Sequence, residues 1–365
     1  MLDARALNRA LLARQHLLER VSTTAIDEIE HLVGMQAQAP LAPYVGLWSR
    51  LLDFDTAELA TAVEDRRVVR SSFMRSTIHL VTASDAFPLR AWTQPALTRG
   101  FASTPFARRL AGIDLDALVD FGREVLDDKP LNRAALGRRL AERWPDGDQE
   151  AMAYAVTTHI PLVQVPPRGV WGLGGAVAWT PMELWLGPRV EEDPDPGRWI
   201  VRYLGAFGPA TLADVSSWSG VTRLGQVMAD LRPSLVSFRD VHKRELFDLP
   251  DAPRPDPDTP APPRFLPEYD NILLGHADRS RIMPPGRGIP LLPGNGGSSG
   301  TILVDGMYAG TWAIARSGER ATLRIVPFEP LSPDERTALE REGARLLEFA
   351  AKGYRPDIVT ERPTT

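Results

Sequence analysis

The chain has 365 residues, 43% of them hydrophobic, and a formal net charge of −5. This length allows two or three domains, or one elongated array of smaller units. Cysteine is absent, which excludes disulfides, a thiol nucleophile and a thiolate metal site. The N-terminus has no apolar core of signal-peptide type, and no run approaches the about 18 apolar residues of a membrane span. We therefore expect a soluble, cytoplasmic protein that does not contact a membrane.

The spacing of apolar residues predicts three stretches that repeat one layout of helices followed by two strands. In the first, helices are expected at about 4–20, 24–38, 44–52 and 56–64, with strands at 68–70 and 73–81. In the second, they are expected near 114–127, 132–143 and 148–160, with strands at 162–165 and 170–172 around a Pro-Pro-Arg-Gly turn. In the third, a helix at 196–206 precedes two helices capped by Thr211 and Thr222, and strands follow at 235–238 and 244–249.

Helices followed by a two-stranded hairpin are the layout of a winged helix. In DNA-binding members the second helix of a pair commonly enters the major groove. Winged helices also serve as scaffolding or protein-binding modules, so the layout alone leaves both functions open.

The C-terminal part begins with a proline-rich connector. Residues 250–263 hold seven prolines, which is typical of an extended linker or of a segment that follows the protein surface. Past it, residues 264–327 are predicted to be mostly β, with short strands at 272–274, 302–304, 308–314 and 321–326, and a helix at 332–353 closes the chain. The glycine-rich run 293–300 lacks the Lys-Ser/Thr of a phosphate-binding loop, so we expect a loop between strands.

One short motif, Gln36-Ala37-Gln38, is set between Met35 and Ala39-Pro40. Residues two apart on an α-helix point to nearly opposite faces, so both amides can serve one site only if the helix ends there. Pro40 disfavours helical geometry at Ala39, and we expect the helix of 24–38 to stop near Gln38. From the residues alone, two surface amides near a helix end remain the simpler interpretation.

Basic charge is concentrated in one region. Between residues 66 and 109 there are eight arginines (66, 67, 70, 75, 90, 99, 108 and 109) and a single acid, Asp85. Arginine binds phosphate in a bidentate manner, so this cluster favours a nucleic-acid partner despite the acidic total. The alternative is that each arginine is a solvated surface charge, as expected for a chain rich in Arg, Ala and Pro.

Other catalytic constellations are not supported. No pair of the six histidines has metal-ligand spacing with a third ligand nearby, and no Gly-x-Ser-x-Gly elbow occurs. Glu268 and Asp270 form a carboxylate pair before the strand expected at 272–274, where they would either do acid–base work or lie at a solvated strand edge. We expect no metal and no cofactor.

Several segments resemble the bacterial winged-helix DNA glycosylases of the AlkZ and YcaQ type. Gln36-Ala37-Gln38 matches the Gln-apolar-Gln form of that family's catalytic motif, and Ser76 to Val81 is similar to its first wing. Tyr203 to Gly220 resembles its middle helix–turn–helix. The C-terminal likeness lies in Phe265 to Leu274, in Asp278-Arg279-Ser280-Arg281 and in Gly300 to Gly306 with Gly310-Thr311-Trp312. The resemblance covers nearly the whole chain.

The resemblance implies an α+β fold of three tandem winged helices with a C-terminal β-rich domain. The expected boundaries are 1–110, 111–190 and 191–249 for the three units, 250–263 for the linker and 264–365 for the last domain. Gln36 and Gln38 would be catalytic. We expect DNA contacts from Arg66, Arg67, Arg70, Arg75 and His79, and from a turn that holds His276, Arg279 and Arg281. For Arg279 and Arg281 the alternative is a structural salt bridge with Glu268, Asp270 or Asp278.

The implied activity is hydrolysis of the N-glycosidic bond of N7- or N3-alkylated purines in double-stranded DNA. Members with Gln-apolar-Gln include a self-resistance enzyme against azinomycin, so bulky natural-product adducts are among the expected substrates. Members with Asp at the third position act more broadly, and we include the crosslinks on which they act among the expected substrates. The expected biological roles are DNA repair and antibiotic self-resistance, and we expect a monomer without an obligate protein partner. Two alternatives remain: a non-catalytic winged-helix transcriptional regulator, and a protein-interaction scaffold, which the acidic net charge favours.

Overall fold

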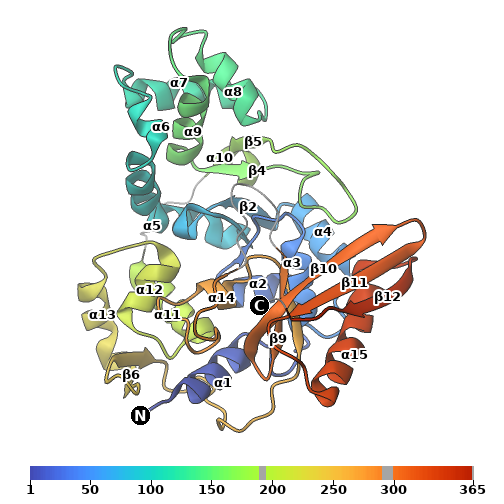
Figure 1. Ribbon diagram of the computed structural model, residues 1–365. Coiled ribbons are helices and arrows are strands. Elements are labelled where there is room, and N and C mark those ends of the chain that lie inside the picture. The colour runs from blue at the N-terminus through green and yellow to red at the C-terminus, as the bar shows by residue number, and fades with distance from the viewer. Residues whose placement is uncertain (189–194, 290–298, 364–365) are drawn as a thin grey trace.

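The computed structural model describes residues 1–188, 195–289 and 299–363. Most of the glycine-rich run 293–300 therefore lies outside the described residues. Helix and sheet are mixed along the chain, which confirms the predicted α+β class (Figure 1). The domain boundaries given above stay a prediction.

The N-terminal segment holds the elements around the Gln-Ala-Gln motif. These are α1 (Ala4–Arg14), α2 (Ala25–His31), β1 (Met35–Gln36), α3 (Ala42–Arg50), α4 (Thr56–Glu64), β2 (Val68–Ser72), the 3₁₀ turn η1 (Met74–Ser76) and β3 (Ile78–Thr82). Side chains of Asp3, Thr24 and Asp55 cap the first, second and fourth helices by accepting backbone N–H groups, which satisfies otherwise unpaired donors.

The predicted helix over 24–38 is wrong in its second half. Helix α2 ends at His31, because Val33 and Gly34 adopt left-handed backbone angles with φ of 55° and 89°. The chain then becomes extended, and β1 pairs antiparallel with β3 in the register Gln36 to His79. The motif therefore begins in a strand.

Helix α5 (Ala83–Ala102) was not predicted, although it is 20 residues long. It contains Pro88 and Pro95, each of which removes a backbone donor and ordinarily interrupts a helix. The side chain of Thr82 caps it through the backbone N–H of Asp85. This helix carries Arg90 and Arg99 of the basic cluster and connects the first segment to the second.

The second segment comprises α6 (Pro105–Arg108), α7 (Leu115–Asp128), α8 (Arg133–Leu140), α9 (Gln149–His159), β4 (Leu162–Gln164), β5 (Trp179–Pro181) and α10 (Met182–Leu186). The strand predicted at 170–172 is wrong: β4 pairs with β5, and residues 166–178 form the loop between them. Strand β4 also pairs with β2 through Arg70 and Gln164, so the hairpins of the first two segments share one sheet of order β1-β3-β2-β4-β5.

The third segment comprises α11 (Pro196–Phe207), α12 (Leu212–Ser219), α13 (Gly225–Leu231), η2 (Arg232–Ser234), β6 (Val236–Arg239) and β7 (Glu245–Asp248). The capping box of Thr211 and Asp214 is confirmed, and Gly220 ends α12 with φ of 78°. The predicted cap Thr222 is not confirmed, because α13 starts at Gly225 after Leu224, which makes no side-chain cap.

The proline-rich connector follows the protein surface and is held there by α1. Arg5, Arg9 and Arg14 donate to the carbonyl oxygens of Pro257, Thr259 and Pro253. Beyond it lie β8 (Arg264–Leu266), α14 (Asn271–Leu274), β9 (Gly300–Val304), β10 (Met307–Ser317), β11 (Arg320–Pro327), α15 (Pro333–Ala350) and β12 (Arg355–Thr360). The strand predicted at 272–274 is wrong, since this stretch is the short helix α14 with Asp270 as its N-cap.

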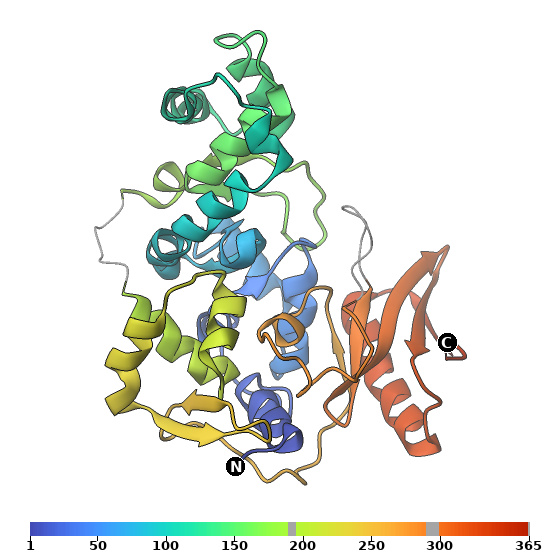
Figure 2. The ribbon, with the colours of Figure 1, turned by 60° about the vertical axis from the view of Figure 1, so that its left-hand side comes forward.

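The first segment lies at the centre of the molecule. In Figures 1 and 2 the second segment extends from one end, and the third segment and the C-terminal sheet lie on opposite sides of the first. The largest apolar core among the described residues joins α1, α5, α11 and α12, and in it the ring of Trp92 contacts the rings of Trp199 and Trp218. Packing thus brings α12, α14 and the motif together, although they are far apart in sequence.

Candidate functional site

The motif is positioned by the turn that precedes it. Gly34 has φ of +89°, and a Cβ at this position would lie 2.6 Å from Cγ1 of Val81. Only glycine allows the chain to turn this close to β3. After the turn, the backbone N–H of Ala37 donates to the carbonyl of Ile78 at 2.8 Å. Gln36 is the last residue of β1 and Gln38 lies in the bend that follows, so the motif sits at the end of a strand and not at the helix end that we expected.

Gln36 is buried, and its amide meets an arginine. Its Oε1 accepts from Nη2 of Arg75 at 2.8 Å, and the side chain is 7% exposed. The same nitrogen of Arg75 lies 3.4 Å from Nε2 of His79 and 3.4 Å from Oδ1 of Asn271. The other nitrogen, Nη1, donates to the carbonyl of Trp218 at 2.8 Å. Four parts of the chain therefore meet at one guanidinium.

Gln38 is exposed and more loosely held. Its Oε1 accepts from the backbone N–H of Ile78 at 3.4 Å, near the limit of a hydrogen bond. The structure thus places Gln36 in the protein interior and Gln38 at the protein surface. Neither glutamine hydrogen-bonds a carboxylate within the part of the chain that the structure describes.

His79 lies beneath Arg75 and is neutral. Burial, and secondarily the charge of Arg75, lowers the pKa of His79 to about 3. Its Nδ1 lies 3.0 Å from the carbonyl of Thr77, which can only accept, so Nδ1 carries the proton and Nε2 faces Arg75 as an acceptor. A neutral, fully buried imidazole is poorly suited to hold a phosphate, so its position does not support the predicted DNA contact.

Buried polar contacts fix the backbone on both sides of Gln36. Arg70 donates to the carbonyl of Ala37 at 2.8 Å, and Asn271 donates to that of Gly34 at 2.9 Å. Arg70 is 3% exposed, and burial lowers its pKa to about 10. This position argues against the predicted phosphate contact of Arg70 and gives it a structural role behind the motif.

The predicted carboxylate pair is divided between two environments. Asp270 forms a bidentate ion pair with buried Arg50, with both distances at 2.9 Å, and so is not free to act as a base. Glu268 has no ion pair within the described residues, and burial raises its pKa. The cavity beside Gln36, between α3 and α14, measures only about 10 Å³, so a purine does not fit behind the motif.

The C-terminal basic turn is largely buried. His276 and Arg281 are 1% and 4% exposed, and they bond to the carbonyls of Phe207 and Pro209. These contacts tie the turn to the third segment and argue against direct DNA contact by either residue. Arg279 differs, since it is half-buried and has no side-chain partner within the described residues. Its charge adds to burial, the larger cause, in lowering the pKa of Arg75.

The basic cluster of residues 66–109 separates into groups by exposure. Arg90 is buried and donates to backbone carbonyls, and Arg109 pairs with Asp148 and Glu150. Arg66 is exposed and stacks on Trp185, with 4.2 Å from its guanidinium carbon to the ring centroid. Three exposed arginines make no side-chain hydrogen bond or ion pair among the described residues: Arg67, Arg99 and Arg108. No sequence signal distinguishes these three, because the distinction depends on burial and on the partners that folding brings close.

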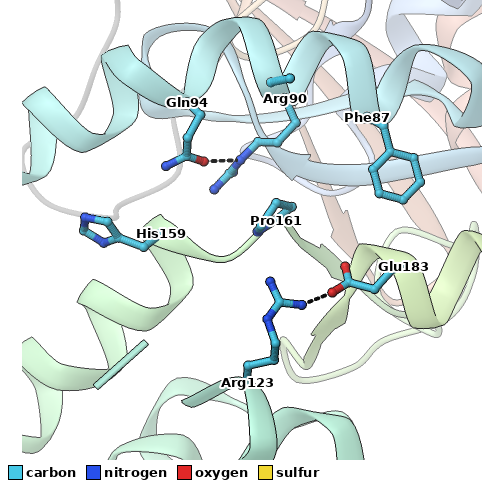
Figure 3. A pocket seen from close by; sticks show the side chains of 8 residues that line it. Phe87, Arg90, Gln94, Arg123, His159, Pro161 and Glu183 are labelled. Atoms are coloured by element: carbon cyan, nitrogen blue, oxygen red, sulfur yellow. Dashed lines mark hydrogen bonds and ion pairs between the residues drawn. The ribbon is translucent and has the colours of Figure 1, made fainter. Parts of the chain in front are cut away.

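A larger cavity of about 360 Å³ lies between α5 and the second segment (Figure 3). Its polar side chains already have partners. Arg90 donates to Gln94 and to backbone carbonyls, Arg123 pairs with Glu183, and Nδ1 of His159 contacts the carbonyl of Ala155. None of the lining residues belongs to the motif, so we do not assign the chemistry to this cavity.

The described ranges 1–188, 195–289 and 299–363 were searched for metal-ion sites and for membrane-spanning helices. No group of three or more His, Asp or Glu side chains there is placed to hold a metal ion. No helix in those ranges is long and apolar enough to cross a membrane.

Comparisons with known proteins place these features in one family. The sequence model described as "DNA glycosylase AlkZ-like" matches residues 29–349. A relative, the interstrand DNA cross-link repair glycosylase of Streptomyces sahachiroi, is 25% identical over 359 residues, which cover 91% of this chain and 92% of the relative. The solved structure of the Streptomyces sahachiroi DNA glycosylase AlkZ is similar with a TM-score of 0.74 at 22% identity, covering 99% of this chain and 100% of that chain.

Proposed function

The chain belongs to the family of AlkZ-like DNA glycosylases, and on that premise we propose that it releases N7- or N3-alkylated purines from double-stranded DNA through Gln36 and Gln38. The observation that carries the proposal is the pair of amides at the motif, without a carboxylate bonded to either of them among the described residues. Membership in an enzyme family favours this function over the regulator and the scaffold.

The chemistry follows from what an amide can do. Hydrolysis breaks the bond between C1′ of the deoxyribose and the purine nitrogen, and the electron pair stays on the purine. Water then bonds to C1′ and loses its proton to solvent. An amide is no base near neutral pH, but it orients water and stabilises charge through its dipole. This weak assistance suffices when the base is already cationic and departs neutral, as an N7- or N3-alkylated purine does.

Larger lesions are part of the proposal. The relative from Streptomyces sahachiroi is named for the repair of interstrand DNA cross-links, and its match spans most of both chains. We therefore include bulky adducts and crosslinks among the substrates to be tested.

We further propose that the helices and hairpins form three winged-helix units that hold the duplex over the motif. In support, α8 and α9 precede β4 and β5, and α12 and α13 precede β6 and β7, as in a helix–turn–helix with its wing. The first two units share a sheet, which would fix their mutual orientation. We place the boundaries at 1–110, 111–190 and 191–249.

The experiment is single-turnover release of 7-methylguanine from methylated duplex DNA by wild type, Gln36→Ala and Gln38→Ala. Loss of one preorganised polar group typically lowers the rate about 10²- to 10³-fold. Because a cationic base already leaves easily, we expect about tenfold to a hundredfold, with DNA affinity nearly unchanged. Wild-type rates in both variants would remove the two glutamines from the mechanism.

A further inference from the structure

The contacts of Arg75 fix the orientation of the Gln36 amide. A guanidinium has only donors, so the Gln36 atom 2.8 Å from Nη2 must be the carbonyl oxygen. The NH₂ group then points away from Arg75. The usual ambiguity between the two ends of a glutamine amide does not arise here, because only one end can accept.

Arg75 is itself held firmly. Its guanidinium reaches the carbonyl of Trp218 at the end of α12 and Oδ1 of Asn271 at the start of α14. Its backbone and that of Ser76 lie in the left-handed region, with φ of 55° and 58°. Non-glycine residues rarely adopt this conformation, and it persists where the surroundings impose it. The turn is thus shaped to aim this one side chain at Gln36.

We propose that Arg75 is a positioning residue that makes Gln36 a hydrogen-bond donor toward the extruded nucleotide, and not an acceptor for the attacking water. The donor would meet an acceptor atom of the departing purine. This inference rests on the proposed function and divides the work between the two glutamines. Gln38, exposed and held by a single 3.4 Å contact, keeps a rotatable amide whose carbonyl can face water.

Charge reinforces this polarity. Arg75 forms no ion pair among the described residues, and it remains protonated at neutral pH although burial lowers its pKa to about 10. A carbonyl that accepts from a cation polarises its amide, which strengthens the N–H groups as donors. The arginine therefore strengthens the NH₂ group of Gln36 as a donor and occupies its carbonyl oxygen.

The discriminating variant is Gln36→Glu. It retains an oxygen for Arg75 but removes the NH₂ donor, and the new ion pair should keep the protein folded. We expect 7-methylguanine release to fall at least tenfold, to the level of Gln36→Ala, with thermal stability equal to or above that of wild type. A Gln36→Glu enzyme as fast as wild type would show that Gln36 accepts, and would overturn the inference. If instead Gln36→Ala itself keeps the wild-type rate, the proposed function fails and not only its refinement.

A double-mutant cycle tests whether Arg75 acts through Gln36. Arg75→Met should reduce the rate about tenfold in the wild-type background. Added to Gln36→Ala it should reduce the rate no further, because a positioning residue has no effect once its target is gone. Arg75→Lys should recover part of the rate. The matched control is Arg90→Met, which removes a buried arginine that, like half-buried Arg75, donates to backbone carbonyls. It should combine additively with Gln36→Ala.

The same variants separate this role from phosphate binding. A phosphate contact contributes a slope of about −0.9 to log K against log salt. We expect Arg75→Met to leave that slope unchanged. A slope flattened by about 0.9, or additive effects in the cycle, would make Arg75 a DNA contact and overturn the inference.

Discussion

At the residue scale, the two glutamines of the motif differ in environment although they are two positions apart. Gln36 is buried against Arg75, whereas Gln38 is exposed beside the backbone of Ile78. A carboxylate introduced at position 36 would meet a cation, and one at position 38 would meet water. Replacing the amide by an acid should therefore change the rate of base release in opposite directions at the two positions.

We predict that Gln38→Asp extends the activity to poorer leaving groups. Because position 38 is exposed, the new carboxylate stays ionised near neutral pH and can stabilise the cationic transition state. The measurement is single-turnover release of 7-methylguanine and of an uncharged purine from duplex DNA. Release of the uncharged purine should rise at least tenfold over wild type. No gain on either base would mean that residue 38 does not face the reacting sugar.

The sequence shows the Gln-Ala-Gln motif but not the contact of Gln36 with Arg75. The catalytic role of the two glutamines stays a prediction. The resemblance to the AlkZ-like family selected Gln36 and Gln38 from the other amide side chains of the chain. Arg75 was predicted as a DNA contact, because its charge is visible in the sequence and its left-handed backbone is not. Burial likewise separates Arg70 and Arg281, which bond to carbonyls, from exposed Arg67.

At the element scale, the strand β1 exists because the chain turns sharply before it. Apolar spacing predicted a helix through this region, and the turn at Val33 and Gly34 overrode it. In α5 the error was the reverse, a helix that was missed. Its two prolines argue against a helix, but packing against the core stabilises one there. Helix α12 was predicted correctly, because Thr211, Asp214 and Gly220 are local signals that act at a helix end.

We predict that Gly34→Ala displaces β1 and impairs base release. The added Cβ would lie 2.6 Å from Cγ1 of Val81 and 3.0 Å from the carbonyl of Leu80, besides the strain of φ at +89°. We expect the free energy of unfolding to fall by about 2 kcal/mol or more in total. Left-handed strain alone would account for about 1 kcal/mol of that loss. Urea unfolding and single-turnover release measure the two effects.

Gly112→Ala is the matched control for Gly34. Gly112 has nearly the same φ, +86°, but a Cβ there meets nothing within 4 Å. It should therefore show the cost of backbone strain without the clash, and keep the wild-type rate of base release. Equal losses of stability and activity in the two variants would mean that the contact with β3 does not position the motif.

At the scale of the whole molecule, a net charge of −5 does not by itself prevent DNA binding. What matters is which cations remain free once the chain has folded. Of the eight arginines between 66 and 109, folding uses Arg70 and Arg90 to bond carbonyls and Arg109 to pair with acids. Arg67, Arg99 and Arg108 are exposed and free of side-chain partners among the described residues, so they are the arginines of this cluster best placed to bind phosphate.

We predict that Arg67, Arg99 and Arg108 carry the salt dependence of binding from this region. Each phosphate contact releases counterions, so replacing one of them by Ala should flatten the slope of log K against log salt by about 0.9, and replacing all three by about 2.7. Fluorescence anisotropy with a duplex at several salt concentrations gives the slope.

Arg109→Ala is the control, because it removes the same charge from an arginine already paired with Asp148 and Glu150. If Arg109→Ala flattens the slope as much as Arg67→Ala does, overall charge and not local contact governs binding. An unchanged slope in the triple variant would place the duplex away from these three arginines.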